Sequence, residues 1–306
     1  MGILGVPMTL NLIKAGYEVV VHNRSADKCA PAEAAGAKVV GTPREVAQAC
    51  DYVFAVVSDP AAALAIATGP DGIAAGMSAG KGYVDVSTVD AATAQTVAAA
   101  VRGAGGMFLE APVSGSKAVA AAVRGAGGMF LEAPVSGSKG PAEAGALIFL
   151  TAGDEELFTA VAGPLDVMGK AKFFLGDVGA GANMKLVVNM VMGSMMVAFA
   201  EGLSLAESAG LNQKDVVDVI ALGAIAAPMF AMKGPLMMHG NYAPAFPLKH
   251  QQKDMRLALE LGESLSQPLP VAAASNGAYM SALDSGLGGD DFCAVVEAIV
   301  ARRFKT

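Results

Sequence analysis

The sequence predicts an α/β protein in which a doubly wound parallel sheet is followed by an all-α domain. Through about residue 155, short β-branched runs alternate with Ala-rich stretches, which is the rhythm of repeated βαβ units. After Gly181 the strand signal stops and helical periodicity takes over. We therefore expect one domain over residues 1–178 and a second over residues 179–306. A composition of 54% hydrophobic and 16% charged residues in 306 suits two packed domains.

The expected strands of the first domain are apolar runs bounded by Gly, Pro, Asp or Ser, at residues 17–22, 37–40, 52–57 and 83–86. Runs without polar alternation indicate a parallel sheet covered on both faces. A helix is expected after the glycine turn that opens the chain, running to about Ala15, and further helices are expected over 43–49 and 91–101. The strand that should precede Gly2 is missing. It would sit centrally in the order 3-2-1-4-5-6, so its loss leaves two sheet edges, and we hypothesise an upstream start that restores it.

The expected helices of the second domain cover residues 182–210, 213–222, 247–265, 270–286 and 290–303. The first is apolar on nearly every face, so we expect it to be surrounded by protein. Its longest apolar run, residues 186–200, is 15 residues long and contains Asn189. Because a bilayer span needs roughly 18 apolar residues, this run predicts a buried helix and no membrane partner.

A perfect tandem repeat interrupts the first domain. Residues 97–117 and 119–139 are identical, so the duplicated segment covers 97–139. Two identical copies do not make a solenoid. Only one copy can fill a single strand position, and the other is expected to loop out or distort the sheet edge. We favour Ser136 over its duplicate Ser114, because the downstream copy joins naturally to the segment after Gly140.

The start of the chain indicates a dinucleotide site. Gly2 and Gly5 fit the last two glycines of G-x-G-x-x-G, which let backbone approach a pyrophosphate at a helix N-terminus. The second strand ends in Asn23-Arg24-Ser25, without the acidic residue that would bind a ribose 2′-OH. Arg24 can pair with a 2′-phosphate, which favours NADP(H) over NAD(H). A solvated surface turn is the plainer alternative.

Charge and composition exclude several classes. A net charge of −7 and a pI near 5.0 argue against a nucleic-acid binder. The three cysteines form no CxxC pair and the three histidines are far apart, so we expect neither a metal site nor a disulfide framework. The same cysteine pattern leads us to expect a reducing compartment. No secretory leader opens the chain, so the expected location is cytoplasmic, with organellar targeting left open.

Four motifs in order carry a family resemblance. They are Gly2-x-x-Gly5, Glu-Ala-Pro-Val-Ser-Gly at 132–137, residues 179–189 around Lys185, and residues 246–254. Together they resemble the β-hydroxyacid dehydrogenase family, a 6-phosphogluconate dehydrogenase-like group that includes 3-hydroxyisobutyrate dehydrogenase. The run at 246–262 and the Asn-Arg-Ser turn most resemble plant-type glyoxylate/succinic semialdehyde reductases. The resemblance implies a Rossmann-like fold and a homo-oligomer formed through the helical domain.

Lys185 is the expected proton donor. Lys185 and Asn189 are four residues apart and share one helix face, and an unpaired buried ammonium is costly, so this face should meet a cavity or a partner. In carbonyl reduction, a positioned ammonium stabilises charge on oxygen and then donates a proton. An ordinary lysine pKa of about 10.4 suits the reductive direction. The resemblance implies the same role. A lysine snorkelling from a helix start is the alternative.

Ser136 and Gly137 lie at the end of a predicted strand, where a hydroxyl and bare backbone N–H groups can hold a substrate carboxylate. The resemblance also assigns this segment to substrate binding. Thr88 follows the strand at 83–86 and matches a family position at the nicotinamide end of the cofactor. A helix cap before Ala91 is the alternative reading of Thr88.

The resemblance adds three residues near the end of the chain. Lys253 and Asp254 match a Lys-Asp pair of the family, which implies that Lys253 reaches the cofactor and Asp254 supports the site. Phe246 matches a substrate-side aromatic. Lys249 and Arg256 share a helical face with Lys253, and for these two a solvated basic face is an equal alternative.

We therefore expect an NADPH-dependent oxidoreductase that reduces small aldehyde acids, such as glyoxylate or succinic semialdehyde, to hydroxy acids. One alternative is an NAD-dependent oxidation of the 3-hydroxyisobutyrate dehydrogenase type. Another is a catalytically impaired binding protein, because the dinucleotide loop is truncated and the duplication lies beside the substrate motif.

Overall fold

A computed structural model describes residues 1–103 and 129–302 of the chain. The chain divides into two compact units, Met1–Lys185 and Leu186–Thr306. The first unit is a Rossmann-like α/β unit and the second is helical, which confirms the expected fold class. The division falls inside the long helix α10 (Ala180–Ser208), so Lys185 belongs to the first unit and Asn189 to the second.

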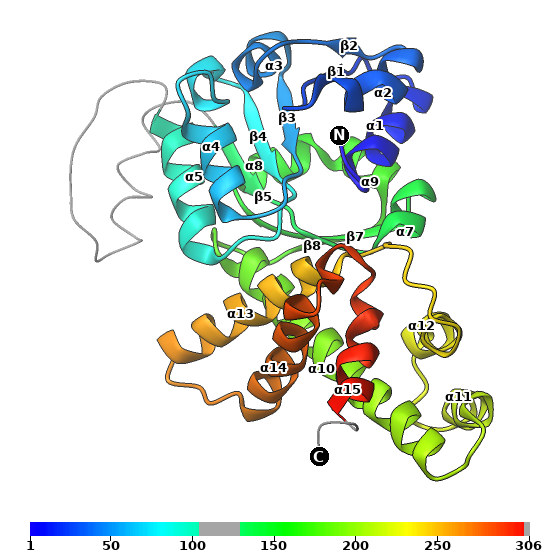
Figure 1. The fold of residues 1–306 in the computed structure, drawn as a ribbon. Helices are drawn as coiled ribbons and strands as arrows, with labels where there is room; N and C mark the ends of the chain where they lie inside the picture. Colours follow the sequence, from blue (N-terminus) through cyan, green and yellow to red (C-terminus); the bar gives the residue numbers. More distant parts are fainter. Residues whose placement is uncertain (104–128, 303–306) are drawn as a thin grey trace. The chain divides into compact units, whose positions relative to one another are not determined.

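The strands of the first unit form two sheets (Figure 1). The smaller sheet pairs β1 and β2 in parallel, and the larger has the order β3-β4-β5-β7-β6 with β8 beside β7. Their bounds are β1 Val20–Val21, β2 Lys38–Val39, β3 Tyr52–Ala55, β4 Gly82–Asp85, β5 Met129–Glu132, β6 Val135–Ser136, β7 Leu147–Gly153 and β8 Gly169–Phe174. The four predicted strands are therefore confirmed; three are shorter than expected, and β4 has the expected length but begins one residue earlier. Pairing is parallel from β3 to β5 and antiparallel between β5 and β7, so the large sheet is mixed.

The described strands of the first unit do not form one continuous sheet. β1 pairs only with β2 among the described strands, and β3 stands at the end of the large sheet. Two sheet edges were predicted at this point, and β1 and β3 are edge strands of the two separate sheets.

Helices surround the large sheet, and Figure 1 shows α4 beside α5. Their bounds are α1 Gly5–Lys14, α2 Ala30–Ala34, α3 Pro43–Ala49, α4 Pro60–Thr68, α5 Ala91–Gly103, α7 Lys139–Glu143, α8 Glu155–Ala160 and α9 Ala162–Met168. Side-chain caps explain where two of these helices begin. Thr42 and Glu45 form a capping box before α3, and the Asp59 carboxylate accepts from Ala62 N at 2.8 Å before α4.

The duplicated segment contributes to two neighbouring elements. α5 ends at Gly103 within the upstream copy, whereas β5 begins at Met129 within the downstream copy. β5 lies between β4 and β7, so the downstream copy fills the strand position, as expected for the copy that carries Ser136. Ser114 lies outside the described residues, as does the part of the upstream copy expected to loop out.

The second unit consists of the remainder of α10 followed by further helices. These are α11 Gln213–Leu222, α12 Pro228–Met238, α13 Leu248–Ser264, α14 Pro270–Asp284 and α15 Val295–Arg302. The expected helices are confirmed, except that α15 begins five residues late, after a 3-10 turn at Phe292–Ala294. α12 was not predicted, because Gly234 and Pro235 in its interior both disfavour helix.

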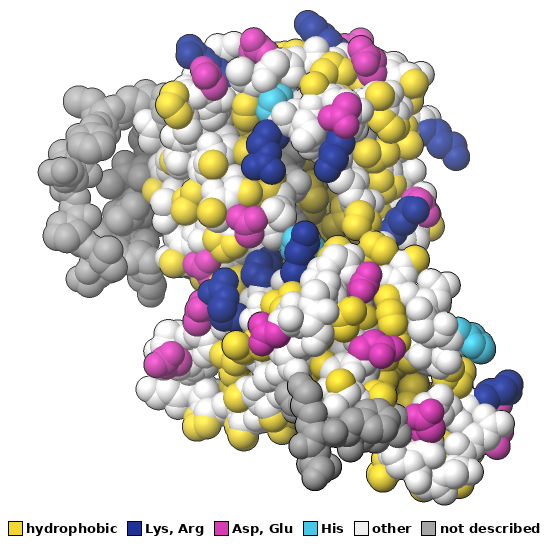
Figure 2. All heavy atoms as spheres, viewed as in Figure 1, with side chains coloured by type: hydrophobic (Ala, Val, Ile, Leu, Met, Phe, Trp, Pro, Cys, Tyr) yellow, Lys and Arg dark blue, Asp and Glu magenta, His cyan; other side chains and the backbone are white. Residues whose placement is uncertain are grey.

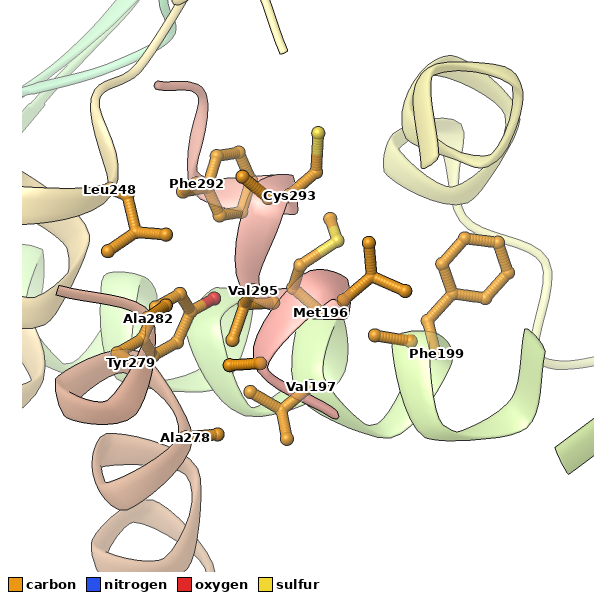
Figure 3. Packing of buried hydrophobic residues seen from close by; sticks show 14 of the residues in the cluster. Met196, Val197, Phe199, Leu248, Ala278, Tyr279, Ala282, Phe292, Cys293 and Val295 are labelled. Atoms are coloured by element: carbon orange, nitrogen blue, oxygen red, sulfur yellow. The ribbon is translucent and has the colours of Figure 1, made fainter. Parts of the chain in front are cut away.

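The core of the second unit forms around α10 (Figure 3). Met196 and Val197 on α10 pack with Tyr279 on α14 and with Val295 on α15. The backbone allows a close approach at Gly193, where an added Cβ would lie 2.4 Å from Gln251 Nε2 and 2.7 Å from Met255 Sδ on α13. A glycine at this position therefore lets α10 and α13 pack directly against each other.

α10 is apolar over most of its length. It has 29 residues, and an 18-residue window reaches a mean hydropathy of 1.7, which is enough by length and composition to cross a membrane. Of that window, 44% is buried inside the structure, and the core helix of a soluble protein meets the same criterion, so this finding is weak evidence for a span.

Candidate active site

The turn before α1 has room for a phosphate. α1 begins at Gly5, its N-cap position is the apolar Leu4, and its first turn carries no acidic residue. An added Cβ at Gly2 would meet open space, and one at Gly5 would lie 3.9 Å from Met1 Sδ. Backbone N–H groups at such a helix start attract anions. The turn therefore fits the pyrophosphate of a dinucleotide.

The Asn-Arg-Ser turn lies beside this helix start. Asn23 Oδ1 accepts a hydrogen bond from the amino group of Met1, and Asn23 Nδ2 donates to Ser25 O at 2.9 Å. Arg24 and Ser25 are exposed. The turn is thus held by the Asn23 side chain while the Arg24 guanidinium faces solvent, where a phosphate can reach it.

Thr88 is half-buried just beyond the carboxyl end of β4. The neighbouring Ser87 Oγ accepts from Val57 N at 3.0 Å, which ties the segments after β3 and β4 together. The carboxylate of Asp90 accepts from Thr93 N at 2.8 Å and from Thr93 Oγ1 at 2.7 Å at the start of α5. Asp90 therefore caps the start of α5, whereas the two readings of Thr88 stay predictions.

The predicted strand that ends in Ser136 and Gly137 is broken. β5 ends at Glu132, and β6 then pairs antiparallel with β7, with Ser136 opposite Ile148. Ser136 is half-buried and Gly137 is exposed. Gly137 has φ +132, so its backbone conformation requires glycine, and an added Cβ would also lie 2.8 Å from Leu147 Cδ2.

Lys185 lies on the second turn of α10 with a relative exposure of only 7%. The helix start itself presses onto the sheet, because an added Cβ at Gly181 would lie 2.3 Å from Leu150 O on β7. The ammonium of Lys185 is therefore carried by a helix whose first turn packs on the strands. Burial removes water from the Lys185 ammonium, so neighbouring polar groups must stabilise its charge.

Glu132 is a buried acid that the sequence reasoning did not single out. Its Oε1 accepts backbone N–H groups at the start of α10, from Gly179 at 2.9 Å, Gly181 at 2.6 Å and Ala182 at 3.3 Å. Burial raises the pKa of Glu132 to about 7 against the lowering effect of these hydrogen bonds. The sequence does show an acidic residue at the end of an apolar strand. It does not show the partner, because the N–H groups that bind Glu132 lie 47 to 50 residues further along the chain.

In the second unit, Asn189 and the Lys-Asp pair are brought together. Asn189 Nδ2 donates to Asp254 Oδ2 at 2.5 Å, and Lys253 Nζ lies 3.0 Å from Asp254 Oδ1. Gln251 Nε2 donates to Asn189 O at 3.0 Å. Asn189 and Asp254 are buried, so α10 and α13 share a polar network within an apolar interface.

Phe246 is held by a buried ion pair that the sequence reasoning missed. Lys233 Nζ lies 2.7 Å from Asp291 Oδ1, and Asp291 is fully buried. Asp291 Oδ2 accepts from Ala245 N at 3.0 Å and Phe246 N at 3.2 Å. The Phe246 ring packs edge-on against Phe292, with centroids 5.8 Å apart. No spacing in the sequence links Lys233 to Asp291.

The other basic residues of α13 lie on the surface. Lys249 and Arg256 are exposed, and Arg256 pairs with Glu260 at 2.6 Å. Figure 2 shows Lys and Arg interspersed with Asp and Glu on the visible face. For Lys249 and Arg256, the solvated alternative is the one the structure favours.

Comparison with protein families matches both parts of the chain. Residues 1–123 and 116–176 match the NAD binding domain of 6-phosphogluconate dehydrogenase, and the two matches overlap at residues 116–123, inside the duplicated segment. Residues 179–299 match the family described as the NAD-binding domain of NADP-dependent 3-hydroxyisobutyrate dehydrogenase.

Individual proteins resemble the chain over nearly its whole length. It is 52% identical over 303 residues to glyoxylate/succinic semialdehyde reductase 2, chloroplastic, of Arabidopsis thaliana, covering 99% of this chain and 78% of that protein. It is 48% identical to glyoxylate/succinic semialdehyde reductase 1 of the same plant, covering 98% and 96%. Among solved structures, 3-hydroxyisobutyrate dehydrogenase from Salmonella typhimurium superposes with a TM-score of 0.82 at 26% identity, covering 97% and 96%.

Proposed function

This chain belongs to the β-hydroxyacid dehydrogenase family of NAD(P)-dependent oxidoreductases, and we propose that it reduces small aldehyde acids to hydroxy acids with NADPH. Glyoxylate and succinic semialdehyde are the proposed substrates. The buried Lys185 on α10 is the observation that carries the proposal, because carbonyl reduction needs a positioned acid at the oxygen. The names of the two Arabidopsis relatives support the substrate class.

The dinucleotide, when bound, supplies the hydride that the aldehyde carbon accepts. Lys185 stabilises the negative charge on the carbonyl oxygen and then donates its proton to that oxygen. Asn189 orients the acid, and its hydrogen bond to Asp254 limits the rotation of its amide. Ser136 and Gly137 hold the substrate carboxylate, and Phe246 packs against the substrate.

The cofactor groups come from several segments. Gly2 and Gly5 accommodate the pyrophosphate, while Thr88 and Lys253 contact the cofactor nearer its reactive end. The Asn-Arg-Ser turn binds the adenosine 2′-phosphate. Positive and negative side chains are interspersed on the surface (Figure 2). This does not argue against a 2′-phosphate site at the Asn-Arg-Ser turn, because charge-assisted hydrogen bonds to a phosphate act at short range.

Initial rates with NADPH and each aldehyde acid test the proposal. Saturable turnover of glyoxylate or succinic semialdehyde is the expected result. Faster oxidation of 3-hydroxyisobutyrate with NAD would favour the alternative within the family. Saturable NADPH binding without turnover of any of the three compounds would favour the impaired binding protein and contradict the proposal.

Replacing Arg24 with alanine should raise the KM for NADPH about tenfold to a hundredfold while that for NADH changes little. The guanidinium would lose a charge-assisted hydrogen bond worth about 1.5–3 kcal/mol to a 2′-phosphate that NADH lacks. Steady-state kinetics with both cofactors measure the effect. The exposed Arg44 provides a matched control, and Arg44→Ala should leave both constants unchanged. Equal losses with the two cofactors would show that Arg24 does not read the 2′-phosphate.

A further inference from the structure

We propose that Glu132 is a positioning residue that fixes the first turn of α10 on the sheet and thereby sets the position of Lys185. The inference rests on the proton-donor role of Lys185 proposed above. Glu132 is 2% exposed and closes β5, which lies between β4 and β7 in the large sheet. A side chain at the end of an interior strand is held in place by the strands on both sides.

The hydrogen bonds of Glu132 go to the groups that a helix leaves unsatisfied. The first N–H groups of a helix have no partner within it, and Glu132 Oε1 accepts three of the N–H groups around the start of α10. Lys185 is four residues beyond Gly181, or about 6 Å along the axis at roughly 1.5 Å per residue. A tilt or shift of the first turn therefore moves the ammonium almost directly.

Two glycines make this contact possible. Gly179 has φ +106, and an added Cβ there would lie 3.1 Å from Ala91 Cβ. An added Cβ at Gly181 would lie 2.3 Å from Leu150 O and 3.0 Å from Glu132 Oε1. The backbone of α10 thus reaches the carboxylate only because both positions lack a side chain. The two glycines that precede Lys185 therefore allow the start of α10 to contact Glu132.

The charge on Glu132 should strengthen the anchor. An ionised carboxylate accepts stronger hydrogen bonds than a neutral one and is stabilised at a helix N-terminus. Burial raises the pKa of Glu132 to about 7, and the nearby Asp85 carboxyl contributes. Ionisation on raising the pH from about 6 to about 8 should therefore tighten the first turn.

Other titratable groups lie on the elements next to β5 and on α10, and among them Asp85 acts on Glu132. Asp85 is its register partner on β4, and burial raises the pKa of Asp85 to about 6. Tyr83 lies on the same strand, and burial raises its pKa. Asp154, after β7, accepts from Phe130 N at 2.8 Å on β5, and Lys185 lies on α10. An Asp85→Asn variant separates the titration of Asp85 from that of Glu132.

Kinetics of Glu132→Gln and Glu132→Asp test the coupling to Lys185. Glu132→Gln keeps the shape but loses the charge, and should lower kcat about tenfold because small misplacements of a proton donor are costly. Its KM for NADPH should stay within about twofold, and the rise in kcat between about pH 6 and 8 should disappear. Glu132→Asp is one methylene shorter and should lower kcat while keeping that rise. The control Glu45→Gln removes another carboxylate that accepts backbone N–H groups, at the start of α3, and should change nothing.

Amide hydrogen exchange of the protein without cofactor gives a second readout. Gly181 and Ala182 should lose about tenfold or more of their protection in Glu132→Ala, and none in Glu45→Gln. Wild-type exchange, kcat and pH profile in the Glu132 variants would overturn the proposal. Normal turnover in Lys185→Ala, with the exchange effect still present, would overturn the proton-donor role while leaving the anchor itself standing.

Discussion

Replacing Lys185 with alanine should lower kcat for aldehyde reduction about a thousandfold. In the proposed mechanism, the variant loses both the charge that stabilises the carbonyl oxygen and the proton that the oxygen takes up. The KM for NADPH should change little, since the proposed pyrophosphate turn at Gly2 and Gly5 and the proposed 2′-phosphate contact of Arg24 remain. Stopped-flow and steady-state rates with glyoxylate measure the loss.

Two further variants separate charge from proton transfer. Lys185→Arg keeps a cation whose pKa is higher than that of lysine, so it should retain part of the charge stabilisation and little of the proton donation. Added primary amines should partly restore turnover of Lys185→Ala. The exposed Lys170 gives a matched control, and Lys170→Ala should behave as the wild type. Full activity of Lys185→Ala would remove the lysine from the mechanism.

Replacing Asp291 with alanine should destabilise the second unit by about 3–5 kcal/mol. The substitution leaves the buried ammonium of Lys233 without its partner at 2.7 Å. It also removes the acceptor of three backbone N–H groups, those of Ala245, Phe246 and Cys293. Urea unfolding followed by circular dichroism, together with hydrogen exchange of the second unit, measures the loss.

A double variant tests whether the unpaired charge is the cause. Lys233→Met combined with Asp291→Leu removes both charges, and should recover much of the stability lost in Asp291→Ala. Asp284→Ala, at the exposed end of α14, is the control and should change stability by less than about 0.5 kcal/mol. An Asp291→Ala protein as stable as the wild type would contradict the assignment of this ion pair to the support of Phe246.

Local signals determined many element boundaries. α11 was predicted with its observed bounds, because Asn212 caps its start by accepting from Lys214 N at 2.9 Å and Gly223 follows its end. α3 follows a Thr-Pro start with Glu45 in the capping box. The same local reasoning did not predict α12, since Gly234 and Pro235 disfavour a helix. Tertiary packing stabilises this helix, because Val217 and Phe199 fill the space that a Cβ at Gly234 would occupy.

The candidate site shows the same limit. The sequence by itself determined the family and the spacing that places Lys185 and Asn189 on one helix. Only the tertiary structure decided their partners, since Glu132 meets Gly181 across 49 residues, Asn189 meets Asp254 across 65, and Lys233 meets Asp291 across 58. Helical periodicity specifies which face a side chain occupies, whereas a buried polar group is satisfied by whatever the fold brings against that face, and that depends on packing between distant segments.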